Sequence, residues 1–168
     1  MSISESLLPE FDQEMANTRK TLERVPMNRF DWKPHERSFS LGVLANHVSR
    51  LLWWGTETMK TESLDLAPKG EGLQGPPLVR TTEELLAAFD EGLADFRRAV
   101  EGAGDEDFLF PWTLYRDGQP LFTLPRAGVI RNTILNHIIH HRGQLTVYLR
   151  MNEVTVPALY GPSADERS

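Results

Sequence analysis

The longest periodic segment of the chain runs from about residue 125 to residue 151, and it limits the available folds more than any other feature. Ile130, Ile134, Leu145 and Tyr148 lie on one stripe when this segment is drawn as a helix of about 3.6 residues per turn. The segment therefore predicts a helix over this range, the longest in the protein.

Two further helices are predicted in the first part of the chain. The apolar residues within Leu8–Val25 are spaced by three or four residues or by sums of these steps, which places them on one helical face. Pro9 suits a first helical turn, and Pro26 marks the end of the helix. A second periodic segment begins near Leu41, directly after Ser40, a residue type that caps helix N-termini.

A third predicted helix follows a long segment that has no periodicity. Thr81 and Glu84 match a capping box, and helical spacing then continues as far as Gly102. The preceding segment, Thr61–Arg80, is rich in glycine and proline and is predicted to be a loop. A structureless loop of this length is unusual in a small domain, so it is a candidate rim for a functional site.

The connection between the third helix and the longest one contains a hairpin signal. Asp117 and Gly118 lie between two short runs of apolar and aromatic residues, a pattern typical of a tight hairpin turn. Residues 152–168 are rich in turn formers, and we expect them to pack across the helices. The fold class is therefore all-α: a four-helix bundle with a small hairpin excursion, in a single domain spanning residues 1–168.

Charge and composition exclude several classes of protein. The formal net charge is -6, and no run of lysine and arginine could follow a phosphate backbone, so nucleic acid is not an expected partner. The sequence contains no secretory signal and no stretch of about 18 apolar residues, so we expect a cytoplasmic protein without membrane association. There is no cysteine, which excludes disulfides, thiolate ligands and a protein thiol nucleophile.

Three of the five histidines point to a metal site. His137 and His141 are one helical turn apart, about 40° around the axis, so their rings can converge on one ion. On the second helix, His47 shares a face with apolar residues and also points inward. Burying unpaired polar groups costs on the order of 1 to 3 kcal/mol each, and one metal ion would satisfy all three rings. Three nitrogen ligands suit zinc or nickel, with iron or manganese as further candidates, and leave one position open.

Structural interpretations of the same residues remain open. A histidine on an apolar helix face is commonly a hydrogen-bonded core residue, and a spacing of four residues between two histidines also occurs by chance. His140 lies at the edge of the face and is interpreted as an outer or surface residue. Gln144 shares the face. Its amide could form a hydrogen bond to a bound water or ligand, or it could be hydrogen-bonded within the core. Arg142 projects away from it, as expected of a surface or inter-helix ion pair.

Three segments resemble, in order, the DinB/YfiT superfamily of bacterial proteins: WKPHERSFSLGVLANHV, NHIIHHRGQL and VPALYGPSADE. The resemblance spans nearly the whole chain. It implies a four-helix bundle in which His47, His137 and His141 bind a metal ion, and it implies a frequent homodimer. Some relatives transfer low-molecular-weight thiols such as bacillithiol, mycothiol or glutathione to electrophiles, whereas many have no assigned reaction.

The leading hypothesis is a metal-dependent transferase that joins a small thiol to an electrophile, or a related hydrolase. The open coordination position would bind the thiol, or water, and lower its pKa. A second hypothesis is a non-enzymatic metal- or ligand-binding protein associated with stress, in which the ion only orders the bundle. A third is a metal-free helical dimer. The sequence assigns no catalytic residue beyond the three candidate ligands.

Overall fold

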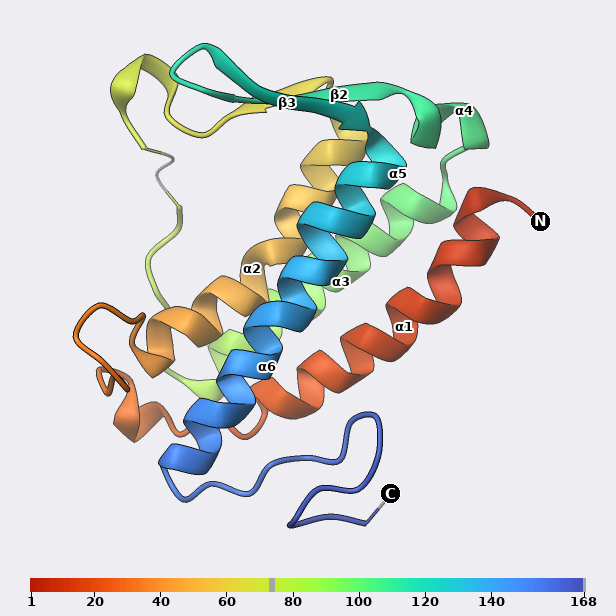
Figure 1. Ribbon diagram of the computed structural model, residues 1–168. Coiled ribbons are helices and arrows are strands. Elements are labelled where there is room, and N and C mark those ends of the chain that lie inside the picture. Colours follow the sequence, from red (N-terminus) through yellow and green to blue (C-terminus); the bar gives the residue numbers. More distant parts are fainter. Residues whose placement is uncertain (73–74, 168) are drawn as a thin grey trace.

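Four long helices form the body of the protein. In the computed structural model, which describes residues 1–72 and 75–167, they pack side by side as a bundle (Figure 1). The helices are α1 (Ile3–Leu22), α2 (Leu41–Lys60), α3 (Thr82–Glu101) and α6 (Asn136–Met151). Both α1 and α2 contact α3 and α6, so each helix has two neighbours around a shared core. The predicted four-helix bundle is therefore confirmed.

The first helix begins earlier than its apolar spacing predicts. Ser2 caps α1: its Oγ accepts a hydrogen bond from the backbone N–H of Glu5 at 3.2 Å, and Glu5 Oε2 accepts one from the N–H of Ser2 at 2.7 Å. This capping box starts the helix at Ile3. Pro9 consequently lies inside α1, and its placement in the first turn was wrong.

The starts of α2 and α3 agree with their predicted caps. Ser40 Oγ accepts a hydrogen bond from the N–H of Val43 at 3.3 Å, and Thr81 Oγ1 accepts one from the N–H of Glu84 at 3.2 Å. A short 3-10 helix, η1 (Met27–Arg29), connects α1 to the segment before α2. These ends are well defined because a local side-chain bond satisfies backbone donors that have no partner within the helix.

The core is continuous through the bundle and is filled by large side chains from all four helices. Among its fully buried members are Phe11, Leu44, Phe89, Phe96, Ile138 and Leu145. Two glycines of α2 let neighbouring rings approach the helix: Gly42 lies against Phe30, and Gly55 lies against Phe96. The packing of α2 therefore depends on positions that have no side chain.

We expect Gly42→Ala to destabilise the protein by about 1–3 kcal/mol, the usual cost of overpacking a dense core. The added Cβ would lie 2.2 Å from Cδ2 of Phe30, which is buried and whose carbonyl accepts the N–H of Gly42 at 2.9 Å. Urea denaturation measures the change. Gly143→Ala in α6 is the matched control, because its Cβ would meet no atom within 4 Å and alanine favours a helix by about 0.5–1 kcal/mol. Equal effects of the two substitutions would contradict this packing.

A three-stranded sheet lies across one end of the bundle (Figure 1). Its strands are β1 (Ser63–Asp65), β2 (Pro111–Arg116) and β3 (Gln119–Pro125). The strands β2 and β3 form the predicted hairpin, and Asp117 and Gly118 at its turn have φ of 51° and 71°. Two positive φ angles are what a tight two-residue hairpin turn requires. The hairpin excursion is confirmed.

The segment 61–80 is more ordered than predicted. It contains β1, which pairs in parallel with β2, and a short 3-10 helix, η2 (Pro68–Gly70). Asp65 joins this segment to the hairpin, because its carboxylate accepts the N–H groups of Asp117 and Gly118 at 2.9 and 2.8 Å. The prediction of a structureless loop was wrong here, since three residues that pair only with a distant strand have no periodicity of their own. Leu73 and Gln74 lie outside the described residues.

The last long helical segment has its predicted extent but not a uniform geometry. It begins as α5 (Arg126–Val129), continues as a π-helix, η3 (Ile130–Leu135), and becomes regular again in α6. Such π-helical turns occur frequently at functional sites. A five-residue helix that was not predicted, α4 (Asp105–Leu109), follows α3. Within the described residues, no helix has both the length and the apolar character to span a membrane.

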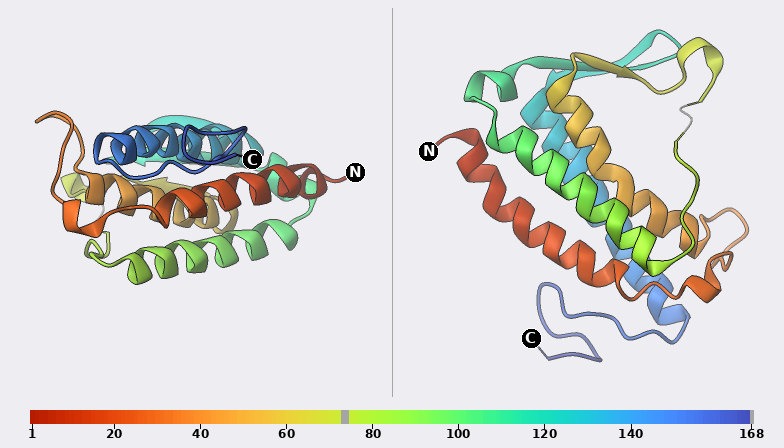
Figure 2. Two further views of the ribbon diagram at one scale, coloured as in Figure 1. Left: turned by 90° about the horizontal axis from the view of Figure 1, so that it is seen from below. Right: turned by 180° about the vertical axis from the view of Figure 1, so that it is seen from behind.

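After α6 the chain turns back along the end of the bundle, below α1 and α6 in Figure 1 and visible from two other sides in Figure 2. Ion pairs connect this segment to the helices: Asp165 pairs with Arg150, and Glu166 pairs with Arg24. The expectation that residues 152–168 pack across the bundle is thus supported as far as residue 167, and Ser168 lies outside the described residues.

A buried ion pair connects α6 to α1. Arg142 is only 1% exposed. Its guanidinium donates to Glu14 Oε2 at 2.6 Å, to the Glu14 carbonyl at 2.9 Å and to Thr18 Oγ1 at 3.1 Å. Tyr160, from the C-terminal segment, also contacts Arg142 and donates to Glu14 Oε2 at 2.7 Å. Of the two predicted roles for Arg142, the inter-helix ion pair is confirmed and the surface pair was wrong.

Candidate metal centre

Three half-buried histidines meet between α2 and α6. One ring nitrogen from each of His47, His137 and His141 lies within 4.8 Å of the other two. The ring centroids are 4.6–5.1 Å apart in all three pairs. In the described part of the chain this group contains no carboxylate, so the candidate ligand set is three imidazoles. The histidines that the sequence singled out therefore lie together.

The spacing of the nitrogens fits a shared ion. His47 Nε2 and His137 Nε2 are 3.3 Å apart. Two nitrogens bound to one tetrahedral ion at about 2.0–2.1 Å lie roughly 3.3 Å from each other. This separation is long for a hydrogen bond between two neutral rings. The pair His47 and His137 thus has the separation that one shared ion requires, and a ring nitrogen of His141 lies within 4.8 Å of both.

The electrostatics of the site keep two of the rings neutral. Burial, together with the neighbouring rings of His141 and His137, lowers the pKa of His47 from 6.5 to about 4. The pKa of His137 is also lowered, mainly by burial and by His141, although a hydrogen bond with the backbone of Thr133 acts in the opposite direction. At neutral pH both rings therefore carry a nitrogen lone pair, which metal binding requires.

Gln144 determines which nitrogen of His141 faces the group. Its Oε1 lies 2.7 Å from His141 Nδ1, and because an amide oxygen can only accept, Nδ1 carries the proton. In the neutral ring, this arrangement leaves the lone pair on Nε2 of His141, the nitrogen that could bind a metal. The amide nitrogen of Gln144 lies 3.1 Å from His140 Nε2 and donates to it. His140 and Gln144 thus form an outer chain that orients a candidate ligand, as is common around metal sites.

The backbone on both sides of the site is held in place. Asn46, the residue before His47, is buried and donates to the carbonyl of Val79 at 3.0 Å, while its Oδ1 accepts the N–H of Val79 at 2.9 Å. On the other side, the π-helical turn η3 ends directly before α6, two residues before His137. Sequence reasoning missed both features, because the partner of Asn46 is distant and π-helical geometry has no clear sequence signal.

Other aromatic and histidine side chains around the bundle lie as follows. Trp54 lines a cavity beside His47. Tyr148 packs edge-on against Trp32 and donates to the carbonyl of Phe39 at 3.3 Å. The ring of Phe39, which sequence reasoning did not select, lies 6.1 Å from that of His47. His35 is exposed in the connector between α1 and α2 and accepts the N–H of Arg37 at 3.2 Å.

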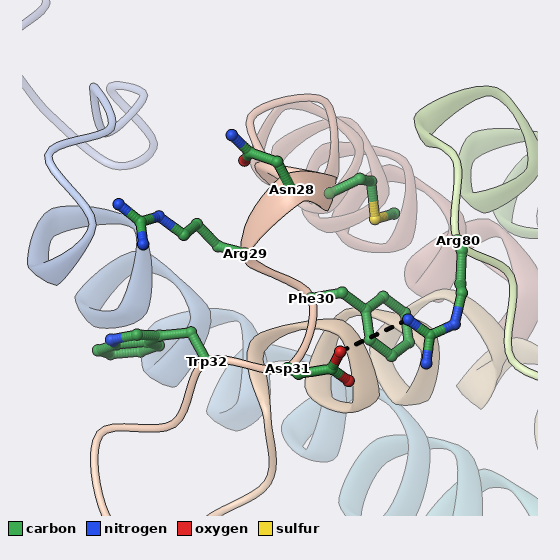
Figure 3. A pocket seen from close by; sticks show the side chains of 7 residues that line it. Asn28, Arg29, Phe30, Asp31, Trp32 and Arg80 are labelled. Atoms are coloured by element: carbon green, nitrogen blue, oxygen red, sulfur yellow. Dashed lines mark ion pairs between the residues drawn. The ribbon is translucent and has the colours of Figure 1, made fainter.

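A second cavity, of about 510 Å³, lies at η1 near the start of α2 and contains none of the three histidines. Figure 3 shows its side chains: Arg29 and Arg80 lie on opposite sides of Phe30 and Asp31. The guanidinium of Arg80 lies over the Phe30 ring, 4.0 Å from its centroid, and pairs with Asp31 at 3.7 Å. The side chains of Arg80 and Asp31 are both largely exposed. The two arginines do not converge on a common point, and an exposed ion pair contributes little. This cavity therefore offers no chemistry comparable to that of the histidine group.

The metal-free protein should lose stability as pH falls from about 6.5 towards about 4. His47 has an ordinary pKa of 6.5 when unfolded and about 4 when folded, so in this interval the unfolded chain binds more protons. Urea denaturation at about pH 7.5 and about pH 5 measures the loss. His47→Gln removes the titrating group and should show a smaller difference between the two conditions. A stability that is equal at both values in the unsubstituted protein would contradict the buried, neutral state of His47.

Comparison with known proteins identifies relatives over nearly the whole chain. The model of the DinB family matches residues 1–167. The uncharacterized protein YrdA of Bacillus subtilis (strain 168) is 48% identical over 159 residues, which are 95% of this chain and 89% of YrdA.

Two solved structures are similar in fold. The crystal structure of a DinB-like protein from Bacillus cereus ATCC 10987 has a TM-score of 0.70 at 22% identity, covering 95% of this chain and 98% of that one. That of the DinB-like protein YjoA from Bacillus subtilis has a TM-score of 0.65 at 17% identity, covering 93% and 94%. At these identities the similarity shows the fold alone.

Proposed function

The chain belongs to the DinB family, and from this premise we propose that it is a metal-dependent enzyme that joins a low-molecular-weight thiol to an electrophile. His47, His137 and His141 would hold one divalent ion, zinc or nickel in the first place and iron or manganese otherwise. The observation that carries the proposal is the convergence of three ring nitrogens without a carboxylate among the described residues. A related hydrolase, with water in place of the thiol, uses the same site.

Three features of the site favour chemistry over a purely structural ion. The group offers three ligands, whereas structural zinc sites are closed by four. The three side chains are half-buried rather than sealed in the core. A cavity of about 680 Å³ also includes His47 in its wall, so a small molecule bound there would lie next to one of the three rings. An open coordination position beside a cavity is the arrangement of catalytic metal sites.

When bound, a divalent ion would supply an open position that lowers the pKa of a coordinated thiol or water towards neutrality. The protein itself keeps the rings of His47 and His137 neutral, and Gln144 fixes the His141 ring with Nε2 towards the group. In the transfer, the thiol proton goes to solvent, the sulfur forms a bond to the electrophilic carbon, and the leaving group departs with its bonding electron pair. The chain contains no cysteine, so the sulfur comes from a second substrate.

The experiment begins with protein purified without an affinity tag, because a histidine tag would itself bind metal. Bound metal is measured by elemental analysis, and bacillithiol, mycothiol and glutathione are each incubated with a panel of electrophiles. We expect about one ion per chain and a loss of free thiol that requires the ion. The matched control is His137→Ala, treated with the same metal. If no electrophile gives metal-dependent loss of thiol, the transferase proposal fails.

The same measurements test the alternative of a non-enzymatic, stress-associated metal-binding protein. That protein would bind the ion and gain stability from it, but would consume no thiol and hydrolyse no substrate. A metal-free helical dimer would bind no ion, and His137→Ala would leave its melting temperature unchanged. The homodimer that the family resemblance implies remains a prediction, which sedimentation analysis of the full chain can check.

A further inference from the structure

The cavity beside the histidine group has a composition that points to one kind of ligand. It follows α2 from His47 towards the C-terminal half of that helix and reaches across to α3. Its volume, about 680 Å³, is within the range of about 300–1,000 Å³ typical of sites for small molecules. The inference drawn from it rests on the proposed function, because it assigns the second substrate of that reaction.

The wall of the cavity on α2 is largely aromatic and apolar. Trp53, Trp54 and Leu51 contribute to it, within two turns of His47. The Trp53 side chain is 46% exposed, although most tryptophans are largely covered. Two adjacent indoles beside a cavity provide a large, stiff apolar surface against which a planar ring can pack. A ligand in the cavity would cover this surface.

The charged groups of the cavity do not form an anion site. Among the described residues, Arg50 is the cation in its wall, and its two terminal nitrogens donate to the carbonyls of Pro76 and Pro77 at 2.9 and 2.6 Å. On the α3 side, the wall includes the carboxylates of Glu91 and Asp95. Asp95 pairs with Arg98, whereas Glu91 is exposed and, within the described residues, forms no ion pair. An anionic ligand would meet a carboxylate here.

We propose that this cavity binds the electrophile as a neutral, planar aromatic compound, with its ring against Trp53 and Trp54. His47 belongs to the wall of the same cavity, so the end of the ring nearer to His47 would face the position where the thiol sulfur would be held. The electrophilic carbon is carried on that end of the ring, and its bond to the leaving group is replaced by a bond to sulfur. Trp53 and Trp54 therefore select the substrate, and Glu91 disfavours rings that carry a carboxylate.

Binding is tested with a ring that cannot react, so that the result does not depend on catalysis. Isothermal titration calorimetry of metal-free protein with 1,3-dinitrobenzene should give saturable binding. Trp53→Ala should weaken it by about tenfold or more, the loss expected when one aromatic surface is removed from a stacked ring. Phe39→Ala is the matched control, because Phe39 is also exposed and also near His47 but is not part of the cavity wall. That variant should bind normally.

A second pair of ligands tests whether the cavity prefers an uncharged ring to one that carries a carboxylate. 3,5-Dinitrobenzoate, which adds one carboxylate to the same ring, should bind more weakly than 1,3-dinitrobenzene, and Glu91→Gln should reduce the difference. The proposal is overturned if 1,3-dinitrobenzene does not bind, if Trp53→Ala binds it as well as the unsubstituted protein does, or if the benzoate binds more tightly. Binding of the ring without any thiol transfer would overturn the proposed function and leave only the aromatic specificity of the cavity. Thiol transfer without ring binding would overturn this inference and leave the proposed function.

Discussion

His137→Ala should lower the affinity for the divalent ion by more than about 100-fold, beyond the largest loss usual for an outer-shell substitution. His137 Nε2 is 3.3 Å from His47 Nε2, and its removal leaves two rings of a group in which no carboxylate of the described residues can take its place. Competition with a metal-sensitive dye, followed by elemental analysis of the dialysed protein, measures the loss.

The matched control for this loss is His35→Ala, since His35 is exposed in the connector and is no part of the group. It should bind the ion as the unsubstituted protein does. Circular dichroism should show that both variants keep their helices. If His137→Ala retained the metal content of His35→Ala, the ion would have to be held elsewhere.

Arg142→Met should lower the free energy of unfolding by about 3–5 kcal/mol, which corresponds to a fall in melting temperature of about 10 °C. Methionine keeps an unbranched chain like the arginine stem but carries no charge, so the carboxylate of Glu14 remains buried without its cation. The Arg142 side chain is 2% exposed and that of Glu14 is 9% exposed, so water cannot replace the lost bonds. Urea denaturation followed by circular dichroism gives the difference.

Arg98→Met is the matched control, because the side chain of Arg98 is 75% exposed in its pair with Asp95. Such surface pairs contribute about 0–1 kcal/mol, so little change is expected. Replacing Glu14 by leucine in the Arg142→Met protein should recover part of the stability, since no buried charge is then left alone. Similar losses for Arg142→Met and Arg98→Met would show that the buried pair does not stabilise the bundle.

The elements that could be predicted from the sequence are those specified by nearby residues. Ser40 and Thr81 begin helices through bonds that span three residues, and Asp117–Gly118 forms its turn locally. The strand β1 and the buried position of Arg142 could not be predicted, because their partners are about 50 and 128 residues away along the chain. The start of α1 was missed for a different reason: its capping box, Ser2 and Glu5, is local, but apolar spacing outweighed it.

The candidate site was predictable to the same extent and for the same reason. A four-residue spacing places His137 and His141 on one helical face whatever the rest of the fold does. His47 could be assigned to an inward face, but only the packing of α2 against α6 brings it to the other two. The cavity wall at Trp53 and the contact between Gln144 and His141 were beyond prediction, because both depend on side-chain directions that spacing alone does not determine.

The separation of the three histidines along the chain also limits when an ion can be captured during biosynthesis. His137 and His141 lie one turn apart and can supply two of the three ligands in an isolated helix, whereas His47 precedes His137 by 90 residues. A ribosome therefore finishes α2 long before the other two ligands exist, and a complete site requires that residue 141 has been made and the helices have docked. Only the assembled bundle could then hold an ion by all three rings, and the bound ion would slow the separation of the helices afterwards.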